Sequence, residues 1–220
     1  MTVRDKPVLS RQAETGWRLW WRYWVVDHAW VRTVAPNCYR VDADIWRSNQ
    51  PGRRRLLKLK AAGARAILSL RGDSLDAASV VEKRAALEAG LPLHFVRMRA
   101  HKLPRPEVLV DALEQLRSLP KPLVVHCKSG ADRTGLIVTI YLHAMKDMPL
   151  SEARRALSWR FGHASWGRAG IVHELLDAYA RDHAETGIGF EDWVAMRYDP
   201  DALTERFNAR PWYRRGPRAQ

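Results

Sequence analysis

Short apolar runs alternate along this chain with longer segments in which apolar residues recur at a helical spacing. The short runs predict strands at residues 38–41, 45–48, 66–70, 93–98 and 123–125. Helical spacing predicts helices at residues 53–62, 75–89, 107–119, 136–142, 151–162, 171–183 and 190–197. Asp73 or Ser74 is expected to cap the second helix, and Ser151 the fifth. Alternating strands and helices indicate an α/β fold, with helices flanking a mostly parallel central sheet and a helical C-terminal half.

The same pattern divides the 220 residues into three parts. Residues 35–198 contain the alternating elements and are expected to form one folded domain. Residues 1–34 form an N-terminal extension, and residues 199–220 form a basic tail. No apolar run has the length of a secretory signal or a membrane-spanning helix, so we expect neither.

The N-terminal extension contains a segment rich in tryptophan and arginine, residues 15–32. Four tryptophans recur at i, i+3, i+4 and i+7 and therefore share one helix face: Trp17, Trp20, Trp21 and Trp24. One interpretation is a peripheral contact with an anionic membrane, with tryptophans among the headgroups and arginines on the lipid phosphates. The other is a helix packed across the folded domain. We favour packing because Asp27 and His28 interrupt the pattern.

Residues 123–135 read Leu-Val-Val-His-Cys-Lys-Ser-Gly-Ala-Asp-Arg-Thr-Gly and connect a predicted strand to a predicted helix. A tight connection of this kind directs backbone N–H groups inward at the positive end of a helix, which makes a site for an anion. The groups expected to bind phosphate belong to Lys128, Ser129, Gly130, Ala131, Asp132 and Arg133. Gly130 and Gly135 permit close approach of the backbone and tight packing of the helix.

Cys127 directly precedes these residues and is the candidate nucleophile. The helix N-terminus and Arg133 are expected to lower its pKa, so that it ionises to a thiolate. The planar guanidinium of Arg133 suits bidentate capture of a tetrahedral oxyanion. The hydroxyl of Thr134 can reach the sulfur and stabilise it as a leaving group. The alternative is a buried structural cysteine in front of an ordinary helix.

The pattern Cys-x5-Arg-Thr, preceded by His126 and an apolar strand, resembles the signature of cysteine-dependent protein tyrosine and dual-specificity phosphatases. Residues 39–51 resemble the corresponding segment of small atypical dual-specificity phosphatases, including bacterial ones. The resemblance implies hydrolysis of phosphate monoesters through a cysteinyl-phosphate on Cys127, with His126 as a supporting residue. No metal or other cofactor is expected, because the arginine and the loop supply the positive field.

The general acid is harder to predict. Members of this family usually carry an aspartic acid in a mobile loop upstream of the cysteine, but residues 97–105 of this chain contain no Asp or Glu. Four residues are candidates for the missing role: Asp132 within the reactive loop, Asp73 after the neighbouring strand, His101 in the expected loop and Glu107 at the next helix. We rank Asp132 and Asp73 first and His101 next. Asp132 could instead neutralise an arginine, and Asp73 and Glu107 could cap helices.

Charge bears on the substrate. Lys and Arg outnumber Asp and Glu by 37 to 24, a net charge of +13, which favours anionic partners. Part of this excess forms an expected basic rim: Arg97, Arg99, Lys102, Arg105 and Lys128. Our first hypothesis is a phosphatase of phosphotyrosine, phosphoserine and phosphothreonine in proteins. The alternative is an inositol-phosphate or phosphoinositide phosphatase with the same mechanism.

Two further functions are weighed against these. Rhodanese-like sulfur transfer also uses a loop cysteine, but Arg133-Thr134 and the helices that follow argue against it. A nucleic-acid-binding module is not expected, because both Cys127 and Arg133 are present. The second cysteine is Cys38, so a disulfide framework is not indicated and a cytoplasmic location is expected, with the inner membrane face as a peripheral alternative.

Overall fold

The computed structural model describes residues 16–27, 29–30 and 36–211. The remaining parts of the predicted extension and tail, residues 1–15, 28, 31–35 and 212–220, lie outside the described residues. Within the described ranges, every helix is too short or too polar to cross a lipid bilayer.

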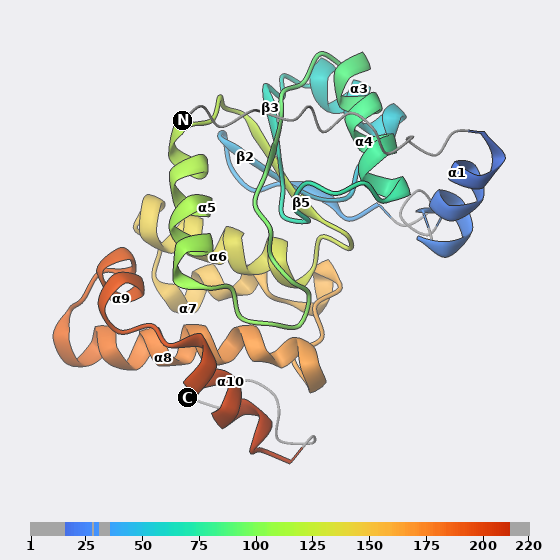
Figure 1. Ribbon diagram of the computed structural model, residues 1–220. Coiled ribbons are helices and arrows are strands. Elements are labelled where there is room, and N and C mark those ends of the chain that lie inside the picture. Colours follow the sequence, from blue (N-terminus) through green and yellow to red (C-terminus); the bar gives the residue numbers. More distant parts are fainter. Residues whose placement is uncertain (1–15, 28, 31–35, 212–220) are drawn as a thin grey trace, which may run out of the picture.

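A five-stranded sheet in the order β1-β2-β5-β3-β4 lies at the centre (Figure 1). Its strands are β1 Cys38–Arg40, β2 Ile45–Asn49, β3 Ala66–Ser69, β4 Leu93–Phe95 and β5 Leu123–Cys127. β1 is antiparallel to β2, and all other neighbours are parallel, which confirms the predicted sheet. All five residues of β5 are buried, because helices cover both faces of a parallel sheet. β5 ends at Cys127, so the candidate nucleophile lies at the carboxyl edge of the central strand.

Alternate residues of the strands point to opposite faces of the sheet and pack into two separate hydrophobic cores. Ile67 and Val124 pack with α3 Arg53–Ala61 and α4 Ala77–Glu88 on one face. Leu68 and Val125 pack on the other face with the larger set of helices. That set contains α5 Pro106–Ser118, α6 Asp132–Lys146, α8 Ile171–Thr186, α9 Phe190–Met196 and α10 Pro200–Asn208 (Figure 1). The alternation follows from the period of two along a strand.

One helix prediction and two helix-cap predictions are wrong. Residues 151–162 form short pieces rather than one helix: α7 Leu150–Ala153, η2 Arg154–Ala156 and η3 Trp159–Phe161. Pro149, not Ser151, precedes the first piece. A further short turn, η4 Gly167–Gly170, leads into α8. The cap of α4 is Asp76, whose carboxylate accepts the Ser79 N–H at 2.8 Å, rather than Asp73 or Ser74.

The folded part continues past the expected boundary at residue 198. α10 begins with Asp199 as its N-cap and packs against α8. Leu203 and Phe207 of α10 are buried in the larger core. Residues 199–208 are therefore part of the packed structure.

The tryptophan-rich segment forms α1 Trp17–Trp21 and a π-helical turn, η1 Arg22–Val26, at one edge of the molecule (Figure 1). η1 contacts α4, so the packing interpretation holds for this turn. It fails for α1, where Trp17, Trp20 and Trp21 are 73%, 60% and 51% exposed.

Candidate active site

The connection between β5 and α6 is a loop whose backbone carbonyls are held outward by donors from the region of β2. The bonds run from Gln50 N–H to Lys128 O at 3.2 Å, from Asn37 Nδ2 to Ser129 O at 2.9 Å, and from Arg47 Nη2 to Gly130 O at 2.8 Å. Because these carbonyls point away from the centre, the N–H groups that follow them are directed inward. This is the arrangement of an anion site.

Gly130 and Gly135 are fixed by close packing, as the sequence predicts. Gly130 has a φ of +74°, and a Cβ there would lie 2.7 Å from the backbone nitrogen of Asn49. A Cβ on Gly135 would lie 2.7 Å from Leu157 Cδ2 and 3.0 Å from the Ala156 carbonyl. The first glycine lets the loop close against β2, and the second lets α6 pack on the residues that follow η2.

Cys127 is buried at the base of this loop, and its sulfur accepts the Gly130 N–H at 3.3 Å. Burial by itself raises the pKa of the thiol. The charge of Arg133 opposes this effect, as do the Thr134 hydroxyl and N–H and the Gly130 N–H, and the pKa of Cys127 is lower than that of an ordinary thiol. The Thr134 hydroxyl has no nitrogen or oxygen partner within the described part of the chain. This hydroxyl can therefore donate to the Cys127 sulfur.

Arg133 lies in the first turn of α6 and reaches across the carboxyl edge of the sheet. Its Nη1 donates to the Met98 carbonyl at 3.1 Å and approaches the Leu70 carbonyl at 3.5 Å. The side chain lines a cavity of about 340 Å³ next to the loop. The other cationic residues around this cavity are Arg71, Arg97, Arg99 and Lys128. This cavity is the candidate active-site cavity.

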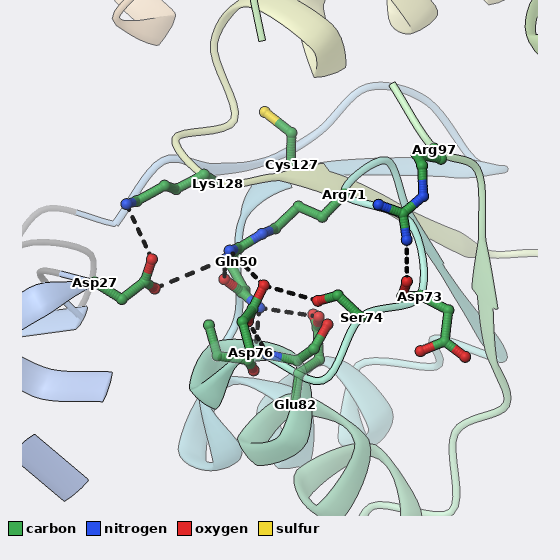
Figure 2. A network of polar contacts seen from close by, with 12 residues as sticks. Asp27, Gln50, Arg71, Asp73, Ser74, Asp76, Glu82, Arg97, Cys127 and Lys128 are labelled. Atoms are coloured by element: carbon green, nitrogen blue, oxygen red, sulfur yellow. Dashed lines mark hydrogen bonds and ion pairs between the residues drawn. The ribbon is translucent and has the colours of Figure 1, made fainter. Parts of the chain in front are cut away.

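The N-terminal extension supplies a carboxylate to the rim. Asp27 lies 2.9 Å from Lys128 Nζ and 3.7 Å from Arg71 Nη1 (Figure 2). Arg71 also lies 3.5 Å from Asp76 and donates to Gln50. The sequence gives no signal for the Asp27 contacts, because they join segments far apart in the chain.

Asp132 does not neutralise an arginine. Its Oδ1 lies 2.6 Å from Nδ1 of the buried His163, whose Nε2 lies 3.0 Å from Nε2 of His173. Burial, followed by the neighbouring His163, lowers the pKa of His173 to about 4. His173 is therefore neutral near pH 7.

Asp73 is not brought to the sulfur. Its carboxylate pairs with Lys83 and points away from Cys127 (Figure 2), while its backbone carbonyl accepts a bond from Arg97. Asp76 instead lines the candidate active-site cavity. Burial tends to raise its pKa, but hydrogen bonds from Ser79 and Ser74 and the charge of Arg71 lower it overall, so Asp76 is poorly suited to donate a proton.

The other two candidate acids lie farther out. His101 is exposed, has a φ of +56° and lines a second cavity beside the first. Glu107 is exposed in the first turn of α5, where a carboxylate stabilises the helix. Among the four candidates, the structure places only Asp132 in the loop.

His126, the residue before Cys127, belongs to a buried network of polar side chains. His126 Nε2 lies 2.7 Å from Oε1 of Glu82, and both side chains are buried. Gln50 donates to the other Glu82 oxygen at 3.0 Å. Burial opposes the charge of His126, but Glu82 outweighs it and raises the pKa of the imidazole. The expected supporting residue thus braces the end of β5 against α4.

Arg47 is a site residue that the sequence analysis does not single out. It is buried beneath the loop, donates to the Gly130 and Ala156 carbonyls, and stacks on Phe161 at 3.7 Å. Burial lowers its pKa to about 10, so it remains charged near pH 7. The signal is an arginine that follows two apolar residues, Ile45 and Trp46, within a predicted strand, since an arginine buried in a strand requires partners.

The fold and the loop agree with the resemblance to cysteine-dependent phosphatases. Residues 46–147 match the family model described as the tyrosine phosphatase family. The dual specificity protein phosphatase TpbA of Pseudomonas aeruginosa is 29% identical over 117 residues, which cover 51% of this chain and 50% of TpbA. The chain thus spans about half the length of the curated relatives that it matches.

Solved structures support the same fold. The crystal structure of P. aeruginosa TpbA has a TM-score of 0.53 and 20% identity, and the match covers 78% of this chain and 90% of that chain. PTPMT1 in complex with PI(5)P has a TM-score of 0.50 and 16% identity, covering 69% and 99%. These structures show the fold alone, and the match of residues 46–147 to the tyrosine phosphatase family model supports the resemblance stated from the sequence.

Proposed function

We propose that this protein hydrolyses phosphate monoesters through a cysteinyl-phosphate on Cys127. The observation that carries the proposal is a buried thiol of lowered pKa at the base of a loop whose carbonyls are held outward. In the first step the thiolate attacks phosphorus, the S–P bond forms, and the bond to the leaving oxygen breaks as that oxygen takes a proton. In the second step water attacks phosphorus, the S–P bond breaks, and phosphate leaves.

Arg133 and the loop N–H groups stabilise the phosphoryl oxygens in both steps. Only Nη1 of Arg133 is engaged within the described residues, which leaves its other N–H donors for the phosphate. Lys128 adds a positive charge at the rim.

Asp132 is the proposed general acid. It begins α6, directly before Arg133, and its pairing with His163 orients the carboxyl group. A proton from this carboxyl goes to the leaving oxygen in the first step. In the second step the carboxylate takes a proton from the attacking water.

Two aryl esters test these roles together. Cys127→Ser should abolish turnover of both p-nitrophenyl phosphate and phenyl phosphate, and Arg133→Lys should lower kcat about a hundredfold or more. Asp132→Asn should slow phenyl phosphate by about a hundredfold and p-nitrophenyl phosphate much less, because nitrophenolate leaves without a proton. Cys38→Ser is the matched control and should retain activity.

Three results would contradict the proposal. Turnover that survives in Cys127→Ser would exclude the covalent intermediate. Equal effects of Asp132→Asn on the two esters would remove Asp132 as the acid. Sulfur transfer from thiosulfate, with no hydrolysis of either ester, would favour the rhodanese-like alternative.

Two substrate classes are proposed. Phosphotyrosine, phosphoserine and phosphothreonine in proteins are supported by the relatives, since TpbA is named a dual specificity protein phosphatase. Inositol or lipid phosphates are supported by the basic rim around Arg133, since several cations there suit more than one phosphate group.

A peripheral membrane contact is also proposed for residues 15–32. The exposed tryptophans of α1 support it, because amphipathic aromatic side chains on a surface are suited to the headgroup region. A cytoplasmic location, expected from the cysteine content, and a peripheral position at the inner membrane face both stay predictions.

A further inference from the structure

A second cavity of about 610 Å³ adjoins the candidate active-site cavity. Arg97 and Arg99 line both, so the two form a continuous basic surface. The far wall of the second cavity is built from η4, the start of α8 and α10, through Arg168, Ile171 and Phe207. These residues lie outside the segment that matches the family model.

The charge of the second cavity is strongly unbalanced. Its basic residues are Arg97, Arg99, Lys102, Arg105 and Arg168, and its one carboxylate is Asp201. Asp201 lies 3.8 Å from Arg105. Arg99, Lys102 and Arg168 have no ion pair or side-chain hydrogen bond within the described part of the chain. Unpaired cations around one hollow repel each other, and a bound polyanion would relieve that repulsion.

The walls of this cavity are held in place. Leu103 and Pro104 are buried, and the Pro104 carbonyl accepts a bond from the buried Tyr198 hydroxyl at 2.7 Å. Arg210, which follows α10, pairs with the buried Glu174 of α8. The loop that carries Lys102 and Arg105 is therefore anchored at Leu103 and Pro104, and the segment after α10 is tied to α8.

We infer that this second cavity binds a further phosphate group of the substrate, and that the substrate is a small molecule carrying two or more phosphate groups. The inference rests on the phosphatase function proposed above and selects the second of its substrate classes. The two cavities have the size of small-molecule sites, and Leu103, Val108 and Phe207 provide an apolar floor beside the cations. Arg97 and Arg99 lie between the two phosphates.

Binding to the Cys127→Ser protein tests the inference without turnover. By calorimetry, inositol hexakisphosphate should bind at least tenfold more tightly than inositol monophosphate, and the difference should shrink as salt is added. Arg168→Ala should weaken hexakisphosphate binding about tenfold more than it weakens binding of inorganic phosphate. Arg206→Ala is the matched control, since Arg206 lies on α10 but outside this cavity, and it should leave both affinities unchanged.

Further arms separate the sources of the phosphates. Vesicles of phosphatidylcholine with phosphatidylinositol bisphosphate test a lipid headgroup as the source. Binding of either hexakisphosphate or these vesicles supports the second phosphate site if Arg168→Ala weakens that binding. Tighter binding of a doubly phosphorylated peptide than of hexakisphosphate would overturn the small-molecule assignment. Equal affinity for hexakisphosphate and monophosphate, or equal losses in Arg168→Ala and Arg206→Ala, would overturn the site itself. Failure to hydrolyse p-nitrophenyl phosphate would instead overturn the proposed function.

Discussion

At the scale of single residues, the site depends on opposed effects at one sulfur. Burial favours the neutral thiol of Cys127, and without compensation it would make this cysteine inert. Arg133, Thr134 and the Gly130 N–H reverse that preference. Arg47 contributes by donating to the Gly130 carbonyl, which holds that acceptor on the side of the loop next to β2.

The lowered pKa of Cys127 predicts reactivity in mildly acidic solution. A free thiol loses about tenfold in thiolate for each pH unit below its pKa, and the lowered pKa of Cys127 gives it a larger thiolate fraction than a free thiol at the same pH. Iodoacetate should therefore label residue 127 much faster than free cysteine near pH 6, as mass spectrometry of labelled peptides can measure. Orthovanadate should protect it. In Arg133→Ala the labelling rate should fall to that of an ordinary buried thiol, and unchanged labelling would contradict the role of the arginine.

The arrangement of the loop residues was predictable because it depends on neighbouring positions of the chain. Cys127, Arg133 and Thr134 lie within eight consecutive positions of the chain, and a strand-to-helix connection fixes their geometry. The partner of Asp132 was not predictable, since His163 lies 31 positions away and only the fold joins them. The positions of Asp73 and Asp76 were not predictable either, because the conformation of the turn between β3 and α4 determines which carboxylate faces the cavity.

At the scale of elements, the buried pair Glu82–His126 couples α4 to the end of β5. Removing one partner of a buried pair leaves the other without compensation, so Glu82→Gln should cost about 3 kcal/mol in the free energy of unfolding. The pKa of His126 is raised in the folded state, so this contribution is full below the ordinary value of 6.5. It is lost as pH rises through the elevated pKa.

Urea unfolding at several pH values measures that contribution. Glu88→Gln is the matched control, since Glu88 lies on the same helix but pairs with Arg53 at the surface. It should change the free energy of unfolding by about 0–1 kcal/mol. A difference between the two variants that grows with pH would contradict the pairing of His126 with Glu82.

Periodicity predicted the strands and the longer helices, because their apolar faces are set by the period of the element itself. It failed at residues 151–162, where the spacing of apolar residues suits a helix but the chain bends into short turns beneath α6. Ala156 and Leu157 there pack against Gly135, and the Ala156 carbonyl accepts a hydrogen bond from Arg47. Close contacts with α6 and β2 therefore override the local preference for one helix.

At the scale of the whole molecule, the N-terminal extension and the candidate site are connected. Asp27, the residue after η1, pairs with Lys128 of the loop and with Arg71. The tryptophan spacing alone cannot distinguish a packed helix from a surface one, since both have a single apolar face. The structure separates them by exposure: η1 rests on α4, and α1 presents its tryptophans outward.

The exposed face of α1 predicts binding to anionic vesicles. Replacing Trp17, Trp20 and Trp21 with serine should weaken co-sedimentation with phosphatidylserine vesicles at least tenfold, because each substitution removes apolar area that would contact the membrane interface. Trp159→Ser with Trp166→Ser is the matched control, since these two tryptophans are also exposed but lie on other turns. Binding should fall with added salt and be weak on phosphatidylcholine, since the arginines act through charge. Equal losses in both sets of variants would show that exposed tryptophans bind vesicles wherever they lie, and would remove α1 as a specific membrane contact.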